Sequence, residues 1–107
     1  MSFELTWSAG DSNAAPVLNI AGVVNFDNAP QVWAHGLALI KEKAPGSLII
    51  DVEKISSANS ALFSVLLRWM SLAQSQSLAF AIRGVSSKLM DVARVSGLET
   101  VLPLHAD

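Results

Sequence analysis

One stretch in the middle of the chain, residues 47–74, constrains the fold more than any other. It opens with an uninterrupted apolar run at residues 48–50 and then reaches Asp51. Aliphatic and β-branched residues without polar alternation are typical of a strand that is buried on both faces. We therefore expect a strand that ends at Asp51, followed by a polar loop over residues 53–58.

A helix is predicted after this loop, with small polar residues at its start. Asn59 and Ser60 are favoured N-cap residue types, whose side-chain oxygens can accept hydrogen bonds from the first free backbone N–H groups. The positive end of the helix dipole would also stabilise a phosphate there, so ordinary capping and anion binding are both open. A large aromatic residue on an apolar helix face usually packs inward, so we expect Trp69 in the core. The whole apolar face consists of Leu62, Val65, Leu66, Trp69 and Ala73.

The first part of the chain predicts a β-hairpin and a helix. Apolar and polar residues alternate over residues 3–7, a second apolar run spans residues 17–24, and turn residues lie between them. Asp27 or Asn28 is placed to cap the helix that follows, and Pro45 comes after its end.

The last part of the chain completes an alternating pattern. Residues 78–82 form another expected buried strand, and residues 88–96 form a last helix that ends at Gly97. Strands that alternate with helices through short links pair in parallel through right-handed crossovers. The sequence therefore predicts one α/β domain over residues 1–107, with a mixed β-sheet, an N-terminal antiparallel hairpin and helices packed on the sheet.

The composition excludes several classes of protein. Hydrophobic residues make up 51% of the chain and the mean hydropathy is +0.44, which fits either an apolar surface covered by a partner or a well-filled core. The net charge is −2 and the basic residues are scattered, so we expect no binding to nucleic acid. The sequence has no cysteine, no signal-peptide pattern and no apolar run long enough to cross a membrane. We therefore expect a cytoplasmic protein without direct membrane insertion.

The sequence offers no recognisable catalytic or cofactor site. It contains neither a glycine-rich nucleotide-binding loop nor a nucleophile elbow. His35 and His105 lie far apart and have no ligand residues at metal-binding spacing. Asp51 and Glu53 could present paired carboxylates, but we expect them to be solvated residues at the end of a strand. The prediction is a protein that is not an enzyme and holds no metal or cofactor.

The central stretch resembles the central motif of the STAS domain family, which includes anti-sigma factor antagonists and a subunit of lipid ABC transporters. The resemblance runs from Asp51 to Arg68 and is carried by the residues DVEKISSANSALFSVLLR. By this resemblance, Asp51 takes the family's strand-ending Asp, Asn59 the loop Asp, and Ser60 the first Ser or Thr. Ala61 stands where many antagonists carry the serine that their kinase phosphorylates.

The first half of the chain adds to this resemblance. A strand, a turn at Phe26 and Asp27, and a helix that carries Trp33 are similar in order to the small STAS subunit of Mla-type phospholipid ABC transporters. The resemblance implies a non-catalytic cytoplasmic subunit, peripheral at the inner membrane, that supports outer-membrane lipid asymmetry. Such a subunit binds and stabilises or regulates the transporter's ATPase, which is in a complex with the permease. The alternative is an anti-sigma factor antagonist whose Ser60 is phosphorylated by an anti-sigma serine kinase.

The expected contact with a partner lies on the side of the central helix opposite its apolar face. This side is small and mostly uncharged, whereas an unpartnered helix face normally carries Lys and Glu. A solvated polar face is the other reading of the same pattern. The candidate partner-binding residues are Asn59, Ser60, Phe63, Ser64 and Leu67, and Ser60 is also a possible phosphorylation site.

Overall fold

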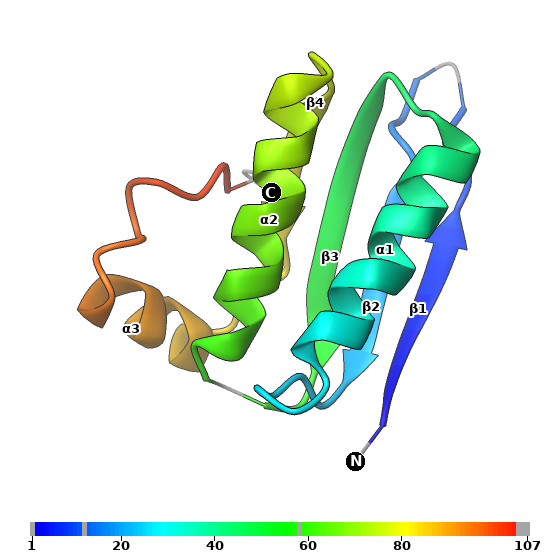
Figure 1. The fold of residues 1–107 in the computed structure, drawn as a ribbon. Coiled ribbons are helices and arrows are strands. Elements are labelled where there is room, and N and C mark those ends of the chain that lie inside the picture. The colour runs from blue at the N-terminus through cyan, green and yellow to red at the C-terminus, as the bar shows by residue number, and fades with distance from the viewer. Residues whose placement is uncertain (1, 12, 58, 105–107) are drawn as a thin grey trace.

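The chain folds into a four-stranded sheet with helices packed on it, as the sequence predicts. The computed structural model describes residues 2–11, 13–57 and 59–104. The elements in chain order are β1 (Phe3–Ser8), β2 (Val17–Gly22), α1 (Ala29–Lys43), β3 (Ser47–Ile55), α2 (Ala61–Ser75), β4 (Ala79–Arg83) and α3 (Ser87–Val95). Figure 1 shows this arrangement.

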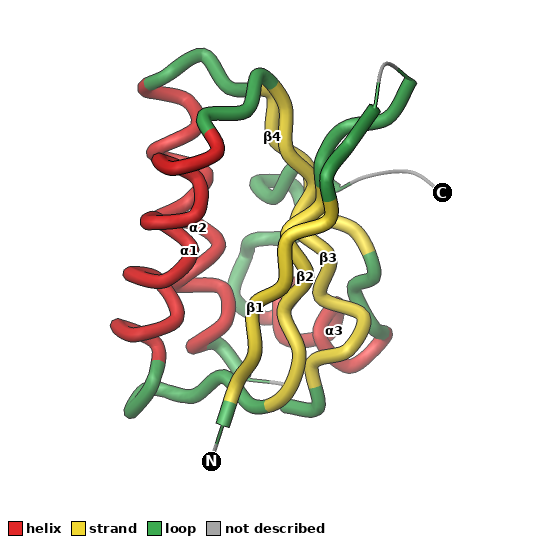
Figure 2. The backbone as a smooth tube through the Cα atoms, turned by 90° about the vertical axis from the view of Figure 1, so that its right-hand side faces the viewer, coloured by secondary structure: helices red, strands yellow, loops and turns green. Residues whose placement is uncertain are grey.

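The sheet is mixed and follows the order of the chain. Its strands lie in the order β1-β2-β3-β4, with β1 antiparallel to β2 and the other neighbours parallel. The N-terminal hairpin and the parallel crossovers predicted from the sequence are therefore confirmed. Helices α1 and α2 lie side by side over one face of the sheet (Figures 1 and 2), and α3 lies beside the start of α2 (Figure 1).

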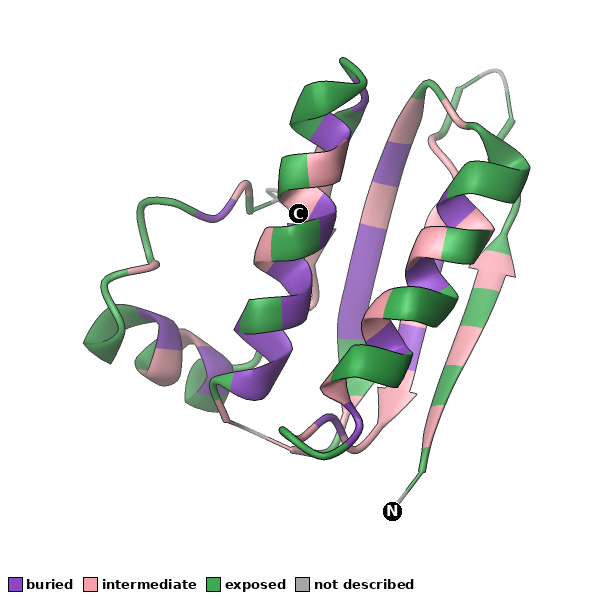
Figure 3. Cartoon of the chain, in the orientation of Figure 1, coloured by how far each residue is buried: buried purple, intermediate pink, exposed green. Residues whose placement is uncertain are grey.

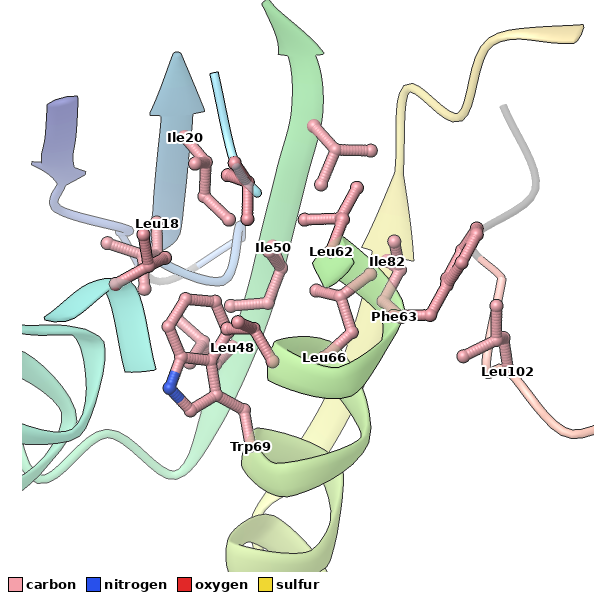
Figure 4. Packing of buried hydrophobic residues seen from close by; sticks show 14 of the residues in the cluster. Leu18, Ile20, Leu48, Ile50, Leu62, Phe63, Leu66, Trp69, Ile82 and Leu102 are labelled. Carbon is pink, nitrogen blue, oxygen red and sulfur yellow. The ribbon is translucent and has the colours of Figure 1, made fainter. Parts of the chain in front are cut away.

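The core lies between the sheet and the two long helices. Strands β2, β3 and β4 contribute alternating aliphatic side chains to it, such as Leu18, Ile50 and Ile82, and α2 contributes the apolar face predicted from the sequence. Trp69 is fully buried at its centre, so the expected inward packing of this residue is confirmed (Figure 4). The burial pattern of Figure 3 shows that the described part of α2 is buried along a broader surface than α1.

The end of the central strand differs from the sequence prediction. We expected β3 to end at Asp51, but it continues to Ile55, which pairs with Gly22 of β2 after a shift in register. The expectation that Asp51 is a solvated strand-end residue is also wrong. Its carboxylate is buried, lies 2.8 Å from Nε of Arg83 on the adjacent strand, and accepts a hydrogen bond from the backbone N–H of Glu53. An ion partner in register on β4 is what allows the charge to be buried.

The C-terminal segment covers the outer edge of β4. The backbone N–H of Ile82 donates to the carbonyl oxygen of Pro103 at 2.9 Å, and Leu104 forms a parallel bridge with Ile82. Leu102, just before, is buried in the core. This edge of the sheet is therefore paired, whereas β1 forms the other edge.

Candidate partner-binding surface

The loop before α2 is tied to the loop after β2 by side-chain hydrogen bonds. Asn59 donates from Nδ2 to the carbonyl oxygen of Val24 at 3.1 Å, and its Oδ1 accepts from the backbone N–H of Ala61 at 2.9 Å. The Ser57 hydroxyl both accepts from the N–H and donates to the carbonyl of Val24. Asn59 is half-buried, and both ends of its side-chain amide are hydrogen-bonded. Its role in the structure is to fix where α2 begins.

Ser60 is the N-cap residue of α2, and it is one of the two residues that the sequence predicts for this position. It is exposed, and its hydroxyl makes no capping hydrogen bond with the helix. Ala61, which follows it, is fully buried. Of these two neighbouring positions, only Ser60 therefore presents a side chain at the surface.

Phe63 lies in the core and not at the surface. Its exposed fraction is 1%, and its ring points toward Leu102 of the C-terminal segment (Figure 4). The expectation that Phe63 offers an apolar contact to a partner is therefore wrong. The reason is that α2 is covered on two sides, by the sheet and by the last part of the chain, so its buried face is wider than the predicted seam.

The exposed ridge of α2 keeps the other predicted contact residues. Ser64 is exposed, and Leu67 is half-buried and packs in part against the core. Together with Ser60 they form a surface that carries no charge, which we call the α2 ridge. Arg68 flanks this ridge.

A shallow groove of about 300 Å³ lies between the start of α1 and α2. The Arg68 guanidinium lies over the ring of Trp33, 5.3 Å from its centroid, at one wall of this groove. None of the ion pairs in the described part of the chain includes Arg68. The residues that line this feature, which we call the Phe26 groove, are Phe26, Ala29, Pro30, Trp33, Ser64, Val65 and Arg68.

Phe26 is the residue of this surface that sequence reasoning missed. Its side chain is 67% exposed although it is a large aromatic residue. The loop that presents it is held by the buried Asn28 side chain, which accepts from the N–H of Asn25 and donates to the carbonyl of Val23. The sequence pattern places Phe26 only in a turn. Its position after the strand and outside any apolar periodicity was the available signal.

Helices α1 and α2 approach each other closely next to Trp33, which lines this groove. Gly36 of α1 faces Trp69 of α2, and a Cβ added at Gly36 would clash with Cζ2 of the indole. The indole Nε1 donates to the carbonyl oxygen of Trp33 at 3.1 Å. Gly36 is therefore required for the indole to lie against the α1 backbone.

A second groove, of about 350 Å³, flanks the α2 ridge on the side of α3. Ser60 lines it together with Asp91, Val92, Val95 and Ser96, and Val95 is 89% exposed. Arg94 on the same helix bonds to Glu99 at 2.8 Å and to Asp91 at 3.0 Å. The hydrogen bond and charge of Glu99, followed by those of Asp91, raise the pKa of Arg94 above its usual value. Asp91 is therefore paired with Arg94, which it shares with Glu99.

The structure supplies no arrangement of residues for metal chemistry in the part that it describes. No group of three His, Asp or Glu side chains among the described residues lies close enough to hold a metal ion. His35 is exposed and contacts the ring of Phe3 edge-on at 5.6 Å, as expected for an ordinary surface histidine. His105 lies outside the described residues. Within the described ranges, no helix is long and apolar enough to cross a membrane.

The comparison with known families decides which kind of domain this is. A family model described as Mlab, STAS domain, matches residues 7–104. The chain belongs to the STAS domain family. No curated protein sequence matches it significantly.

Solved STAS-like structures agree with the fold. The structure is similar to an anti-sigma factor antagonist from Mycobacterium paratuberculosis, with a TM-score of 0.76 and 17% identity over 99% of this chain and 87% of that chain. It is also similar to the unphosphorylated antagonist SpoIIAA, with a TM-score of 0.70 and 18% identity over 99% and 90% of the two chains. At these identities the likeness shows the fold alone.

A third structure is similar to this chain in fold and has a higher sequence identity than the other two. A chain of the Acinetobacter MlaFEDB complex, in an ATP-bound conformation, gives a TM-score of 0.71 and 27% identity over 83% of this chain and 93% of that chain. Together with the family model, this makes the protein a STAS domain most like MlaB.

Proposed function

We propose that this STAS domain is a non-catalytic subunit of an Mla-type phospholipid ABC transporter. In this role it binds the MlaF-like ATPase subunit, stabilises or regulates it, and lies in the cytoplasm at the inner membrane through that contact. The transporter in turn supports outer-membrane lipid asymmetry. The match of the MlaB family model to residues 7–104 is the observation that carries this proposal.

The proposed contact surface is the α2 ridge with the Phe26 groove beside it. Ser60, Ser64 and Leu67 present a ridge without charge, and Phe26 adds an exposed aromatic ring next to it. Aromatic and Arg side chains are enriched among the residues that dominate binding at interfaces. Arg68, which has no ion pair in the described structure, can add an interaction with a carboxylate of the ATPase. Asn59 supports this surface by holding the start of α2.

A second candidate function is an anti-sigma factor antagonist that is switched by phosphorylation of Ser60. The exposed Ser60 hydroxyl, free of a capping bond at a helix N-terminus, favours this candidate. A phosphate there would be stabilised by the helix dipole while it added charge to the ridge. The buried Ala61 weighs against it, because it replaces the serine that many antagonists modify.

The test is a binding measurement between this chain and the ATPase subunit of the Mla-type transporter from the same organism, purified in complex with its permease. We expect wild-type chain to bind and to change the rate of ATP hydrolysis. Phe26→Asp should weaken binding by at least about tenfold, because it places a charge in the centre of the proposed interface. Because the Phe26 side chain is exposed, we expect this substitution to leave the fold intact, and thermal unfolding checks this directly.

The matched control is Val101→Asp, which changes another exposed apolar residue, 49% exposed and outside both grooves. It should bind the ATPase like the wild type. Absence of wild-type binding would refute the transporter proposal. A Phe26→Asp chain that binds normally would refute the proposed surface, and specific phosphorylation of Ser60 by an anti-sigma serine kinase would favour the second function instead.

A further inference from the structure

The two edges of the sheet differ in whether their outward backbone groups are paired. The outer edge of β4 is paired, since Ile82 donates to Pro103 and bridges to Leu104. The outer edge of β1 has no neighbouring strand in the described part of the chain, and Figure 1 shows it as the last strand on its side. Natural edge strands are usually protected by charged side chains, especially Lys, by Pro or by a bulge. β1 has neither Lys nor Pro, its one charged residue is Glu4, and it pairs with β2 without a break in register.

The unpaired backbone groups of β1 can be assigned from its register. Ser2 accepts from the N–H of Val23 at 3.0 Å, and the antiparallel register pairs Phe3 with Gly22 and Glu4 with Ala21. Residues alternate between bonding inward and outward along an antiparallel strand. Glu4, Thr6 and Ser8 therefore bond toward β2. The N–H and C=O groups of Phe3, Leu5 and Trp7 point outward to the free edge.

This set of outward groups is complementary to itself under a two-fold axis. We propose that β1 pairs in antiparallel fashion with β1 of a second copy of this chain, with the axis at Leu5. This register pairs Phe3 with Trp7 of the second copy and Leu5 with Leu5, and each pair exchanges two hydrogen bonds, so that every outward group is used. The resulting dimer has one continuous sheet across both copies.

The side chains agree with this register. Phe3, Leu5 and Trp7 all lie on the helix side of β1, half-buried, and would form aromatic and aliphatic cross-strand pairs with their counterparts. Glu4 and Thr6 lie on the other side, where each Glu4 comes to face Thr6 of the second copy. Like charges do not meet in this arrangement. An interface of one strand is small, so we expect a weak dimer, with a dissociation constant of about 10 μM to 1 mM.

The dimer is independent of the proposed transporter function. The α2 ridge and the Phe26 groove are formed by α1 and α2 on the helix layer, whereas the dimer uses the backbone edge of β1. Failure of one proposal therefore leaves the other standing.

The experiment measures self-association of the purified full chain by sedimentation velocity over roughly 10 μM to 1 mM, the range in which a weak dimer becomes visible. Thr6→Glu and Thr6→Lys are the test variants, because Thr6 is exposed and faces Glu4 of the second copy only in this register. The Glu variant should raise the dissociation constant by about threefold to tenfold, and the Lys variant should lower it by about as much, through the two symmetry-related pairs. Ala79→Glu and Ala79→Lys, at an exposed position of β4, are the matched controls and should leave it unchanged.

Amide hydrogen exchange supplies a second readout. The amides of Phe3, Leu5 and Trp7 should become more protected as concentration rises, while those of Glu4 and Thr6 should be protected at every concentration. A chain that remains monomeric throughout this range would overturn the proposal. So would Thr6 variants of opposite charge that shift the dissociation constant in the same direction, or concentration-dependent protection that appears only in the helices.

Discussion

The contact between Gly36 and Trp69 makes an unusual prediction for a helix substitution. Gly36 lies in the middle of α1, where replacing Gly by Ala ordinarily stabilises a helix by about 1 kcal/mol. In this structure the added Cβ would lie 2.5 Å from Cε2 of the fully buried indole and closer still to its Cζ2. We therefore expect Gly36→Ala to destabilise the domain.

The magnitude follows from three contributions. Overpacking a tightly packed core costs about 1–3 kcal/mol. Displacement of the indole also breaks the hydrogen bond from Trp69 to the carbonyl of Trp33, at about 1 kcal/mol. The gain in helix propensity offsets about 1 kcal/mol. The net loss in the free energy of unfolding is about 2 kcal/mol, which lowers the Tm of a domain of this size by about 8–16 °C.

Urea denaturation and thermal unfolding, followed by circular dichroism, measure this loss. Gly46→Ala is the matched control, because nothing lies within 4 Å of the Cβ that it adds, and it should change the stability by less than about 0.5 kcal/mol. Adding Trp69→Phe to the Gly36→Ala chain should cost less than adding it to the wild type, since it removes the ring atoms that the new Cβ meets. A Gly36→Ala chain as stable as the wild type, or more stable, would refute the packing argument.

Two hydrogen-bonded helix starts give further predictions. Ser86 caps α3 by accepting from the N–H of Leu89 at 3.1 Å, so Ser86→Ala should lower the free energy of unfolding by about 1 kcal/mol. Ser87→Ala, at the adjacent exposed position, should change this free energy little. Equal effects of the two substitutions in urea denaturation would contradict the prediction. Asn59→Ala removes both bonds that hold the start of α2 and should cost about 1–3 kcal/mol. Asn59→Asp keeps only the oxygen that accepts from the N–H of Ala61, so its stability should fall between those of the wild type and Asn59→Ala in the same assay. An Asn59→Ala chain as stable as the wild type would show that the loop needs neither bond.

The elements of the fold could be predicted because their apolar periodicity matches their final burial. The apolar residues from Leu62 to Ala73 indicate a helix and its buried face. The alternation in β1 indicates a strand and its buried face. The end of β3 could not be predicted, because Glu53 and Lys54 interrupt the apolar pattern, and the strand continues to Ile55 only because β2 lies beside it. Asp51 shows the same limit, since its burial depends on Arg83, which lies on another strand.

The candidate surface was predicted in part. The position and exposure of Ser60 and Ser64 follow from helix spacing alone. Phe63 was placed at the surface because its cover comes from Leu102, far along the chain. Phe26 was missed because its position outside any apolar periodicity is a weak local signal, and the exposure of a loop residue depends on how the neighbouring helices are placed. Asn59 was predicted as a residue of this site, but its hydrogen bond to the carbonyl of Val24 follows only from the folded structure, in which the two loops lie together.

The cover that the C-terminal segment gives to Phe63 and to the edge of β4 bears on how the protein is made. Leu102 and Pro103 follow every residue that they cover in the chain, yet they complete the core and pair the final strand. Without them, the aromatic ring of Phe63 and the backbone edge at Ile82 are open to solvent. The core can therefore be completed only after this segment has been made, and a chain that is cut before Leu102 presents an apolar surface to chaperones and proteases.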